Sequence, residues 1–412
     1  MSYDVVCGVS QTAINRAIRE VFTRNLADYR GQLGSVQFTL PPPSVFIHAA
    51  AGAPQATGQG SFDYVLVTNL TFGSDTSIPS VGITVNGTGS FQISNKVGNQ
   101  YLEATLLDAK LLPTNNEHLT SLQVQNISPL LPGLVASLNN TFLAPIQIPA
   151  LQYPWMLEIG TPLLAMEAQF LTSYSKLGKG EPQPLPAQDW PADGFFVGID
   201  VAVLEAAMNL AVLFPLAPSI DFIWENAAGQ ASALLLPPTV TVNSDGSVNA
   251  AFLTQVSCKG NLTSAWLSKF SFSPTATATV NLTLWPTMIN SQMCLVIKTP
   301  SIPTFDFDWT FPFNWLMGVS AVSDFVQKVA DGLNAVLWRL IGKTLEFAPI
   351  PVFTAPTISY TIPYASNVEF AITQMIPSNR SGQLMLAYQL DVSSTIVAPD
   401  PKGTMVPPST SS

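Results

Sequence analysis

Two stretches of the chain, 190 residues apart, carry the pattern of an apolar strand followed by an amphipathic helix. In the first, apolar residues 5–9 lead to Ser10, a residue type that caps helix N-termini. Apolar residues then recur at the 3.6-residue helical period: Ala13, Ile14, Ala17, Ile18, Val21 and Phe22. In the second, Gly198 takes the place of Gly8 and Asp200 that of Ser10, before Val203, Leu204, Ala207 and Met208. We therefore predict two copies of one strand–helix unit.

A longer apolar stripe also occurs twice. Residues 128–142 carry it at Leu130, Leu131, Leu134, Val135, Leu138 and Phe142, before an Ala-Pro-Ile segment at 144–146. Residues 322–341 carry it at Val322, Phe325, Val326, Val329, Leu333, Val336, Leu337, Leu340 and Ile341, before Ala-Pro-Ile at 348–350. Both patterns predict helices. The same order of elements in both halves indicates an internal repeat.

Between these helices the pattern alternates with the two-residue period of a strand. Residues 275–285 place Ala, Val and Leu on one face and Thr and Asn on the other, and residues 81–85 and 358–362 alternate similarly. Residues 240–242 and 248–256 predict a hairpin around the turn at 243–246. The exposed strand faces are therefore expected to carry Thr, Ser and Asn instead of charges.

These elements predict an α+β protein of two similar modules, each a highly twisted antiparallel sheet wrapped around a long amphipathic helix. We place the modules at residues 1–175 and 194–398. A linker rich in Pro and Gly, residues 176–193, is expected to join them. Residues 399–412, rich in Pro, Ser and Thr, are expected to form a disordered tail.

Composition narrows the class of protein. Only 10% of the 412 residues are charged, and the net charge is −10, whereas an ordinary globular chain has about 25% charged residues. No basic cluster is present, which argues against nucleic acid and against charge-driven binding to anionic lipid. The best transmembrane candidate, residues 201–224, is broken by prolines and carries two acids. We expect a soluble protein with no signal peptide, either cytoplasmic or released by a non-classical route.

Groups that carry chemistry are sparse. The two histidines and three cysteines lack the spacing of a metal site. Free thiols are favoured, although Cys258 and Cys294 could pair. A nucleophile elbow is absent, and Asp306 and Asp308 have no basic partner nearby in sequence. His48 is interpreted as structural. We therefore predict no catalytic residue, no cofactor and no metal site.

One segment alternates aromatic residues at every second position. These are Phe305, Phe307, Trp309, Phe311, Phe313 and Trp315. An extended backbone would put all six rings on one side. Such a strip is typical of a strand packed into the core, and the alternative is an aromatic wall for an apolar ligand or an interfacial anchor.

The order of elements resembles the tubular lipid-binding (TULIP) superfamily, typified by bactericidal/permeability-increasing protein (BPI) and by the OrfX-type proteins of clostridial toxin gene clusters. The residues that carry the resemblance are 6–10, 196–200 and the helix with its Ala-Pro-Ile-x-Ile-Pro segment at 128–149. Size and the lack of a signal place the chain nearer the toxin-cluster branch. It departs from the antibacterial branch because it has no basic N-terminal tip, no signal peptide and no clear cysteine pair.

The resemblance implies a non-enzymatic carrier of lipid or another apolar, fatty-acid-like ligand in elongated hydrophobic grooves. The residues expected to line the grooves are Ile14, Ile18, Phe22, Leu134, Leu138, Leu204, Met208, Val329, Leu333 and Val336. The main alternative is a structural or interaction subunit of a toxin-associated or other assembly, with self-filled grooves and a protein partner or a homo-oligomer. A third interpretation is a Ser/Thr-rich β-sandwich adhesin with added helices.

Overall fold

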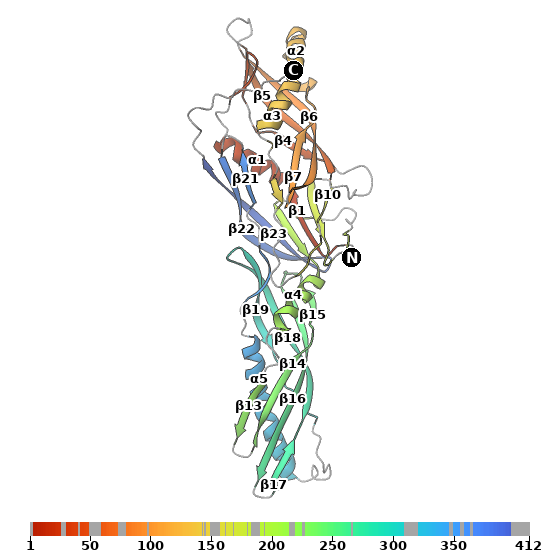
Figure 1. Ribbon diagram of the computed structural model, residues 1–412, viewed down its shortest axis with the longest axis vertical. Helices are drawn as coiled ribbons and strands as arrows, with labels where there is room; N and C mark the ends of the chain where they lie inside the picture. The colour runs from red at the N-terminus through yellow and green to blue at the C-terminus, as the bar shows by residue number, and fades with distance from the viewer. Residues whose placement is uncertain are drawn as a thin grey trace.

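The computed structural model is a long rod in which three antiparallel sheets follow one another along the axis (Figure 1). The N-terminal sheet lies at one end, a central sheet lies near the middle, and the C-terminal sheet lies at the other end. The structure describes residues 3–25, 30–39, 42–48, 59–72, 80–96, 99–141, 143, 146–148, 157–160, 162–167, 169–178, 180–182, 190–192, 194–213, 219–224, 227–264, 267–308, 320–345, 349–354, 358–362 and 366–396.

The N-terminal sheet has eight strands and three associated α-helices. Its path is β2 (Arg30–Leu33), β3 (Val36–Thr39), β5 (Gln59–Thr71), β6 (Val81–Lys96), β7 (Asn99–Leu106) and β9 (Ile146–Ile148). Off this path, β4 (Ser44–Ile47) pairs with β5, and β8 (Lys110–Leu111) pairs with β6. The helices are α1 (Gln11–Asn25), α2 (Ser121–Ile127) and α3 (Leu131–Thr141), with short 3₁₀ turns at Pro113–Asn115 and Ser128–Leu130.

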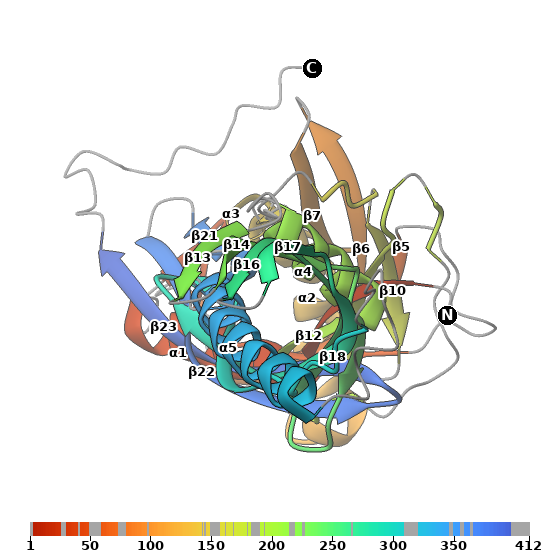
Figure 2. The same ribbon diagram turned by 90° about the horizontal axis from the view of Figure 1, so that it is seen from below.

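The C-terminal sheet also has eight strands. Its path is β13 (Ser219–Trp224), β14 (Ala227–Leu235), β16 (Val248–Ser264), β18 (Thr275–Ile289), β19 (Gln292–Ser301) and β20 (Ile350–Thr354). Off this path, β15 (Thr239–Val242) and β17 (Leu267–Phe272) both pair with β16. Seen end-on, the strands curl into an arc, and α5 (Ser320–Leu345) lies across its open side (Figure 2). The helix α4 (Val201–Leu213) packs against β15 and β20.

The central sheet takes strands from both ends of the chain. Its order is β10 (Leu163–Glu167), β11 (Phe170–Ser175), β1 (Val5–Ser10), β12 (Phe195–Ile199), β23 (Gln383–Ile396), β22 (Ser366–Arg380) and β21 (Ile358–Ile362). The two strands that precede α1 and α4 therefore lie side by side at its middle. The sequence analysis did not predict this sheet, because it placed each strand–helix unit in a separate module.

The pairing of β1 with β12 is symmetric. Gly8 lies opposite Phe196, and Gly198 lies opposite Val6. Neither glycine has room for a side chain. A Cβ on Gly8 would lie 2.1 Å from Cζ of Phe196, and a Cβ on Gly198 would lie 2.7 Å from Cγ1 of Val6. Neighbouring side chains occupy the space over both glycines, so a larger residue at either position would displace them.

The local predictions are largely confirmed. Helices α1, α4 and α5 and strands β6, β18 and β21 lie where the periodicity placed them, and β15 and β16 form the predicted hairpin around the turn at 243–247. The helix expected from residue 128 differs, because helical structure already begins at α2. Thr120 caps that helix in a reciprocal capping box with Gln123, and Pro129 lies in a 3₁₀ turn before α3.

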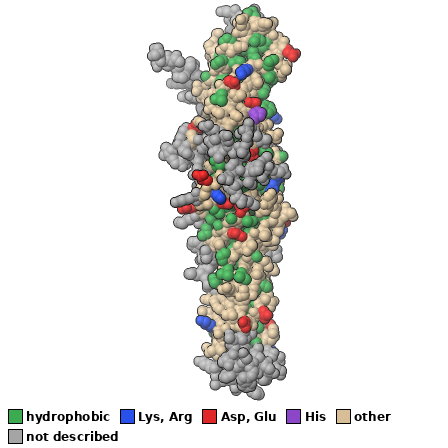
Figure 3. All heavy atoms as spheres, turned by 90° about the vertical axis from the view of Figure 1, so that its right-hand side faces the viewer, with side chains coloured by type: hydrophobic (Ala, Val, Ile, Leu, Met, Phe, Trp, Pro, Cys, Tyr) green, Lys and Arg blue, Asp and Glu red, His purple; other side chains and the backbone are tan. Residues whose placement is uncertain are grey.

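The confirmed fold class is an α+β protein dominated by antiparallel sheet. The module boundaries at residues 175 and 194 stay a prediction, and residues 399–412 lie outside the described residues. No helix among the described residues is long and apolar enough to cross a membrane. On the face shown in Figure 3, charged side chains are few and scattered.

A buried hydroxyl on the central sheet gives a first testable prediction. Tyr388 is 1% exposed, and among the described residues its OH has no hydrogen-bond partner. Burial raises the pKa of this phenol well above its usual value. Because an unsatisfied buried hydroxyl costs about 1–3 kcal/mol, Tyr388→Phe is expected to raise the free energy of unfolding by about 1 kcal/mol.

Urea denaturation followed by circular dichroism measures this change. Tyr174→Phe is the matched control, because the Tyr174 OH donates to the Glu167 carboxylate, and its removal is expected to lower stability. A Tyr388→Phe variant that is as destabilised as Tyr174→Phe would contradict the prediction.

Candidate functional site

Both strand–helix units are fixed by a side chain at the helix start. The Ser10 hydroxyl accepts a hydrogen bond from the backbone N–H of Ala13 at 3.1 Å. The Asp200 carboxylate accepts one from the N–H of Ala202 at 3.0 Å. Ser10 and Asp200 are both buried, and both lie at the end of a central-sheet strand. The predicted N-caps are therefore confirmed, and they set the direction in which α1 and α4 leave the sheet.

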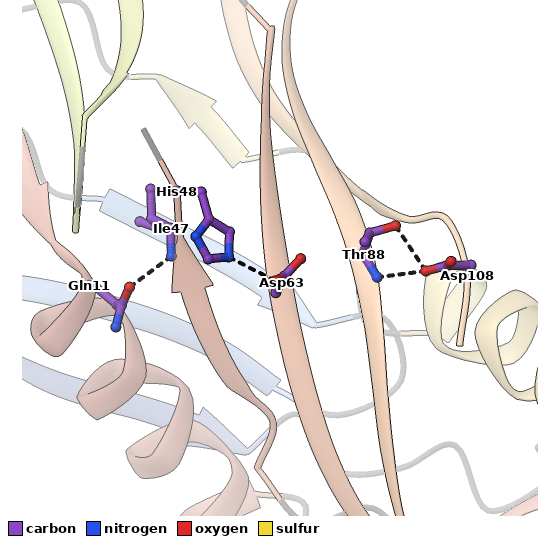
Figure 4. A network of polar contacts seen from close by, with 6 residues as sticks. All are labelled: Gln11, Ile47, His48, Asp63, Thr88 and Asp108. Carbon is purple, nitrogen blue, oxygen red and sulfur yellow. Dashed lines mark hydrogen bonds and ion pairs between the residues drawn. The ribbon is translucent and has the colours of Figure 1, made fainter. Parts of the chain in front are cut away.

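Helix α1 is joined to the edge of β4 by side-chain amides. Asn15 forms two hydrogen bonds with the backbone of Val45: its Nδ2 donates to the carbonyl at 2.8 Å, and its Oδ1 accepts from the N–H at 2.7 Å. One turn earlier, Oε1 of Gln11 accepts from the N–H of Ile47 at 2.7 Å (Figure 4). We call these three bonds the amide clamp of α1.

Helix α4 makes a simpler version of this contact in the C-terminal half. Oε1 of Glu205 accepts a hydrogen bond from the backbone N–H of Val240, on β15, at 3.0 Å. Glu205 occupies the same place in its unit as Asn15, and Val201 occupies the place of Gln11. Because the Val201 side chain is apolar, it cannot form a counterpart of the hydrogen bond between Gln11 and Ile47.

Helices α3 and α5, which we call the closing helices, carry a further matched pair of contacts. Asn139 on α3 binds both backbone groups of Leu106, at 2.8 and 2.9 Å. Asn334 on α5 binds both backbone groups of Phe305, at 2.7 and 3.1 Å. Each asparagine directly follows a predicted groove residue, Leu138 or Leu333. Sequence reasoning missed these asparagines, although a polar residue at the same place in both apolar stripes was a usable signal.

The ten predicted groove residues divide between two apolar cores. Ile14, Ile18, Phe22, Leu134 and Leu138 belong to or pack against the N-terminal core. Leu204, Met208, Val329, Leu333 and Val336 belong to or pack against the C-terminal core. The structure thus brings each set of five together. Their role in binding a ligand stays a prediction.

Burial differs between the residues on α1 and those on α4. On α4, Leu204 and Met208 are 0% exposed, and Leu333 on α5 is also 0% exposed, so their side chains are covered by the protein itself. On α1, Ile14, Ile18 and Phe22 are only partly buried. The two helices have equivalent positions but leave different amounts of apolar surface uncovered.

The aromatic strip is described only at its start. Phe305 and Phe307 are 2% and 7% exposed and lie in the C-terminal core, while Asp306 between them is exposed. An isolated β-bridge joins Asp308 to Thr275, and Asn334 binds the backbone of Phe305. Both rings therefore point inward, as the core interpretation expects. Trp309, Phe311, Phe313 and Trp315 lie outside the described residues.

The titratable groups form structural contacts. His48 Nε2 lies 2.8 Å from Oδ2 of Asp63, with both side chains about half exposed (Figure 4). Asp108 accepts two hydrogen bonds from Thr88, which lower the pKa of the Asp108 carboxyl. The described residues contain no group of His, Cys, Asp and Glu that could hold a metal ion.

The cysteines are free thiols in the structure. Burial raises the pKa of the Cys7 thiol to about 12 and that of Cys258 to about 12, and it also raises the pKa of Cys294. All three are therefore protonated at neutral pH. Since the thiolate is the nucleophile and the metal ligand, these cysteines are poorly suited to either role.

Sequence reasoning also missed a buried carboxylate in the central sheet. Glu167 is 6% exposed and accepts hydrogen bonds from Nε1 of Trp190 at 2.6 Å, from the Thr172 hydroxyl at 3.1 Å and from the Tyr174 OH. Trp190 belongs to the segment predicted as a linker. Its ring stacks on Phe196 at 5.1 Å, so this part of the segment is anchored to the sheet.

Together these features define a rod-shaped α+β protein with two helix-closed apolar cores on either side of a shared central sheet. No protein-family model matches the sequence, and no curated protein matches it. Among the similar solved structures are three that match nearly the whole chain. Lipopolysaccharide binding protein is 12% identical, covers 95% of this chain and 99% of its own, and gives a TM-score of 0.33.

The other two are P47 proteins. P47 from Clostridium botulinum A2 is 9% identical, with 94% of this chain and 97% of that chain covered and a TM-score of 0.43. P47 of Clostridium botulinum E1 is 8% identical, with 95% and 99% covered and a TM-score of 0.44. At these identities and scores, the likenesses assign neither a family nor a function to the chain, and its own geometry carries the proposals below.

Proposed function

We propose that the chain consists of two copies of one TULIP-like module. The central sheet supports this, because β1 and β12 each have a hairpin beside them, β10–β11 next to β1 and β22–β23 next to β12. The outer sheets support it too: β4 and β15 pair in the same way with β5 and β16. The closing helices supply a fixed offset, since Leu134, Leu138 and Asn139 lie 195 residues before Val329, Leu333 and Asn334.

We propose that the protein is a non-catalytic binder of an elongated apolar molecule such as a lipid acyl chain, and that the N-terminal half holds it. The observation that carries this proposal is the partial burial of Ile14 and Ile18, whereas their counterparts on α4, Leu204 and Met208, are fully covered. Phe22, further along α1, is also only partly buried. Apolar side chains that remain accessible beside a core favour an apolar ligand. Burial of such a chain is worth about 0.8 kcal/mol per CH₂.

Organic extraction of the purified protein followed by mass spectrometry tests this directly. We expect a co-purified lipid, and we expect the extracted protein to take up a fluorescent fatty acid. Ile14→Ala/Ile18→Ala should weaken that uptake about tenfold, which corresponds to about 1.4 kcal/mol of lost apolar burial. Ile220→Ala, a partly buried apolar residue on β13 in the C-terminal half, is the control and should leave the affinity unchanged. Absence of both co-purified lipid and uptake would argue strongly against carriage.

A second candidate is an interaction subunit whose cores are filled by its own side chains. The complete burial of Leu204, Met208 and Leu333 favours this for the C-terminal half. It predicts no bound lipid and either a homo-oligomer or a protein partner of fixed stoichiometry. Size-exclusion chromatography with light scattering distinguishes it from a carrier that acts as a monomer.

A further inference from the structure

We propose that α1 and β4 form the gate through which the apolar ligand reaches the N-terminal core, and that the amide clamp of Gln11 and Asn15 holds this gate closed. This inference rests on the function proposed above.

The clamp bonds occupy the edge of β4 at which a further strand would otherwise pair. In an antiparallel pair, alternate residues direct their backbone groups away from the partner strand. The backbone of Val45 and the N–H of Ile47 are bonded to the α1 amides, while β4 pairs with β5 along its other edge. Residues four apart on a helix rise about 6 Å, and residues two apart on a strand rise about 6.8 Å. Gln11 and Asn15 are therefore spaced to match these two strand residues.

The hinge lies at the N-terminal end of α1. The hydroxyl of Ser10 accepts from the N–H of Gly194 at 3.2 Å, which ties the helix start to the central sheet. The N–H of Gln11 donates to the carbonyl of Gln169 at 2.7 Å, and the N–H of Gln169 donates to the carbonyl of Ile47 at 3.3 Å. These backbone bonds hold residues 10 and 11, so opening is expected to swing α1 away from β4 about this end and to break the clamp bonds of the Gln11 and Asn15 side chains.

Two properties suit α1 to opening. Its apolar residues Ile14, Ile18 and Phe22 are incompletely buried, so less apolar surface is exposed when it moves away. The clamp bonds are made by neutral amides at partly buried positions, where water can replace the lost partner. The other part of the gate, β4, is short as well, with four residues.

The C-terminal half provides the comparison within the same molecule. There the N–H of Val240 on β15 donates to Glu205 on α4, and the α4 residues Val203, Leu204 and Met208 are completely buried. Moving α4 would expose this apolar surface to water. Helix α4 is therefore held in place by the burial of its apolar side chains, whereas α1 is held by the hydrogen bonds of the amide clamp.

Stopped-flow fluorescence with a pyrene-labelled hexadecanoic acid tests the gate on the full-length, delipidated protein. For Gln11→Ala/Asn15→Ala we expect both the uptake and the release rates to rise at least fivefold, with the dissociation constant changed less than twofold. Glu205→Ala, which removes the equivalent bond of the other half, should leave both rates within twofold of wild type. Circular dichroism checks that each variant is folded.

The outcomes separate the two proposals. If wild-type protein takes up no probe, the proposed function and the gate both fail. If it takes up the probe at rates that the double variant does not change, the gate alone is overturned.

A second measurement needs no variant. Hydrogen exchange of the wild-type protein should show the amides of β4 exchanging at least tenfold faster than those of β15. Ligand should slow exchange in β4 only. Equal protection of β4 and β15 would overturn the gate even if the double variant did not fold.

Discussion

Replacing Trp190 with alanine is expected to lower the free energy of unfolding by about 3–5 kcal/mol, the range for truncating a buried aromatic side chain. The indole is 5% exposed and stacks on Phe196 with an interplanar angle of 18°. Its Nε1 also donates the 2.6 Å hydrogen bond to Glu167. The substitution therefore leaves a cavity and removes one of three donors from a buried carboxylate, which adds to the loss.

Chemical denaturation followed by far-ultraviolet circular dichroism measures this loss without relying on tryptophan fluorescence. Trp190→Phe is the matched control, because it keeps an aromatic ring in the cavity and removes the donor. It should cost clearly less than Trp190→Ala. A loss below about 1 kcal/mol for the alanine variant would mean that this part of the predicted linker is not anchored to the central sheet.

Leu333→Ala is expected to be comparably damaging, with a loss of about 2–5 kcal/mol. Leu333 is 0% exposed and lies on α5 in the C-terminal core, with Leu337 and Ile341 also buried along the same helix. Protein interiors are close-packed, so the neighbours can fill only part of the space that the side chain leaves. Urea denaturation provides the measurement.

Leu333→Met is the control for this site, because a swap of similar volume usually costs less than about 1.5 kcal/mol. The result also bears on the interaction-subunit alternative. A C-terminal core filled by its own side chains must lose stability when Leu333 is truncated. A loss below about 1 kcal/mol would instead indicate space for a ligand in that half.

Several elements of the fold could be predicted because their signals are local. Ser10 and Asp200 cap helices with their own side chains, and the bonds reach only two or three residues along the chain. The alternation in residues 275–285 needs nothing more than a strand with one buried face. The equal offset of Leu134 from Val329 and of Leu138 from Leu333 was readable without any structure.

Other features had no local signal. Tyr3 donates a hydrogen bond to Gln383 at 3.1 Å, across 380 residues of sequence. Asn15 is a polar residue on an amphipathic helix, and its pattern is the same whether it faces water or the backbone of Val45. Trp190 lies among prolines and glycines that indicate a linker, and only the position of Glu167 explains its burial.

The sequence by itself determined which segments are helices and strands, which faces are apolar, and that a strand followed by a helix recurs 190 residues later. These properties follow from periodicity and from side chains acting on their own neighbourhood. The tertiary structure alone decided that β1 and β12 meet in one central sheet. It also decided which strand edges form hydrogen bonds with the side chains of Gln11, Asn15 and Glu205, and how completely the apolar face of each helix is buried. Those outcomes depend on packing between distant segments, because a backbone group or an apolar face acquires its partner only when the whole chain is folded.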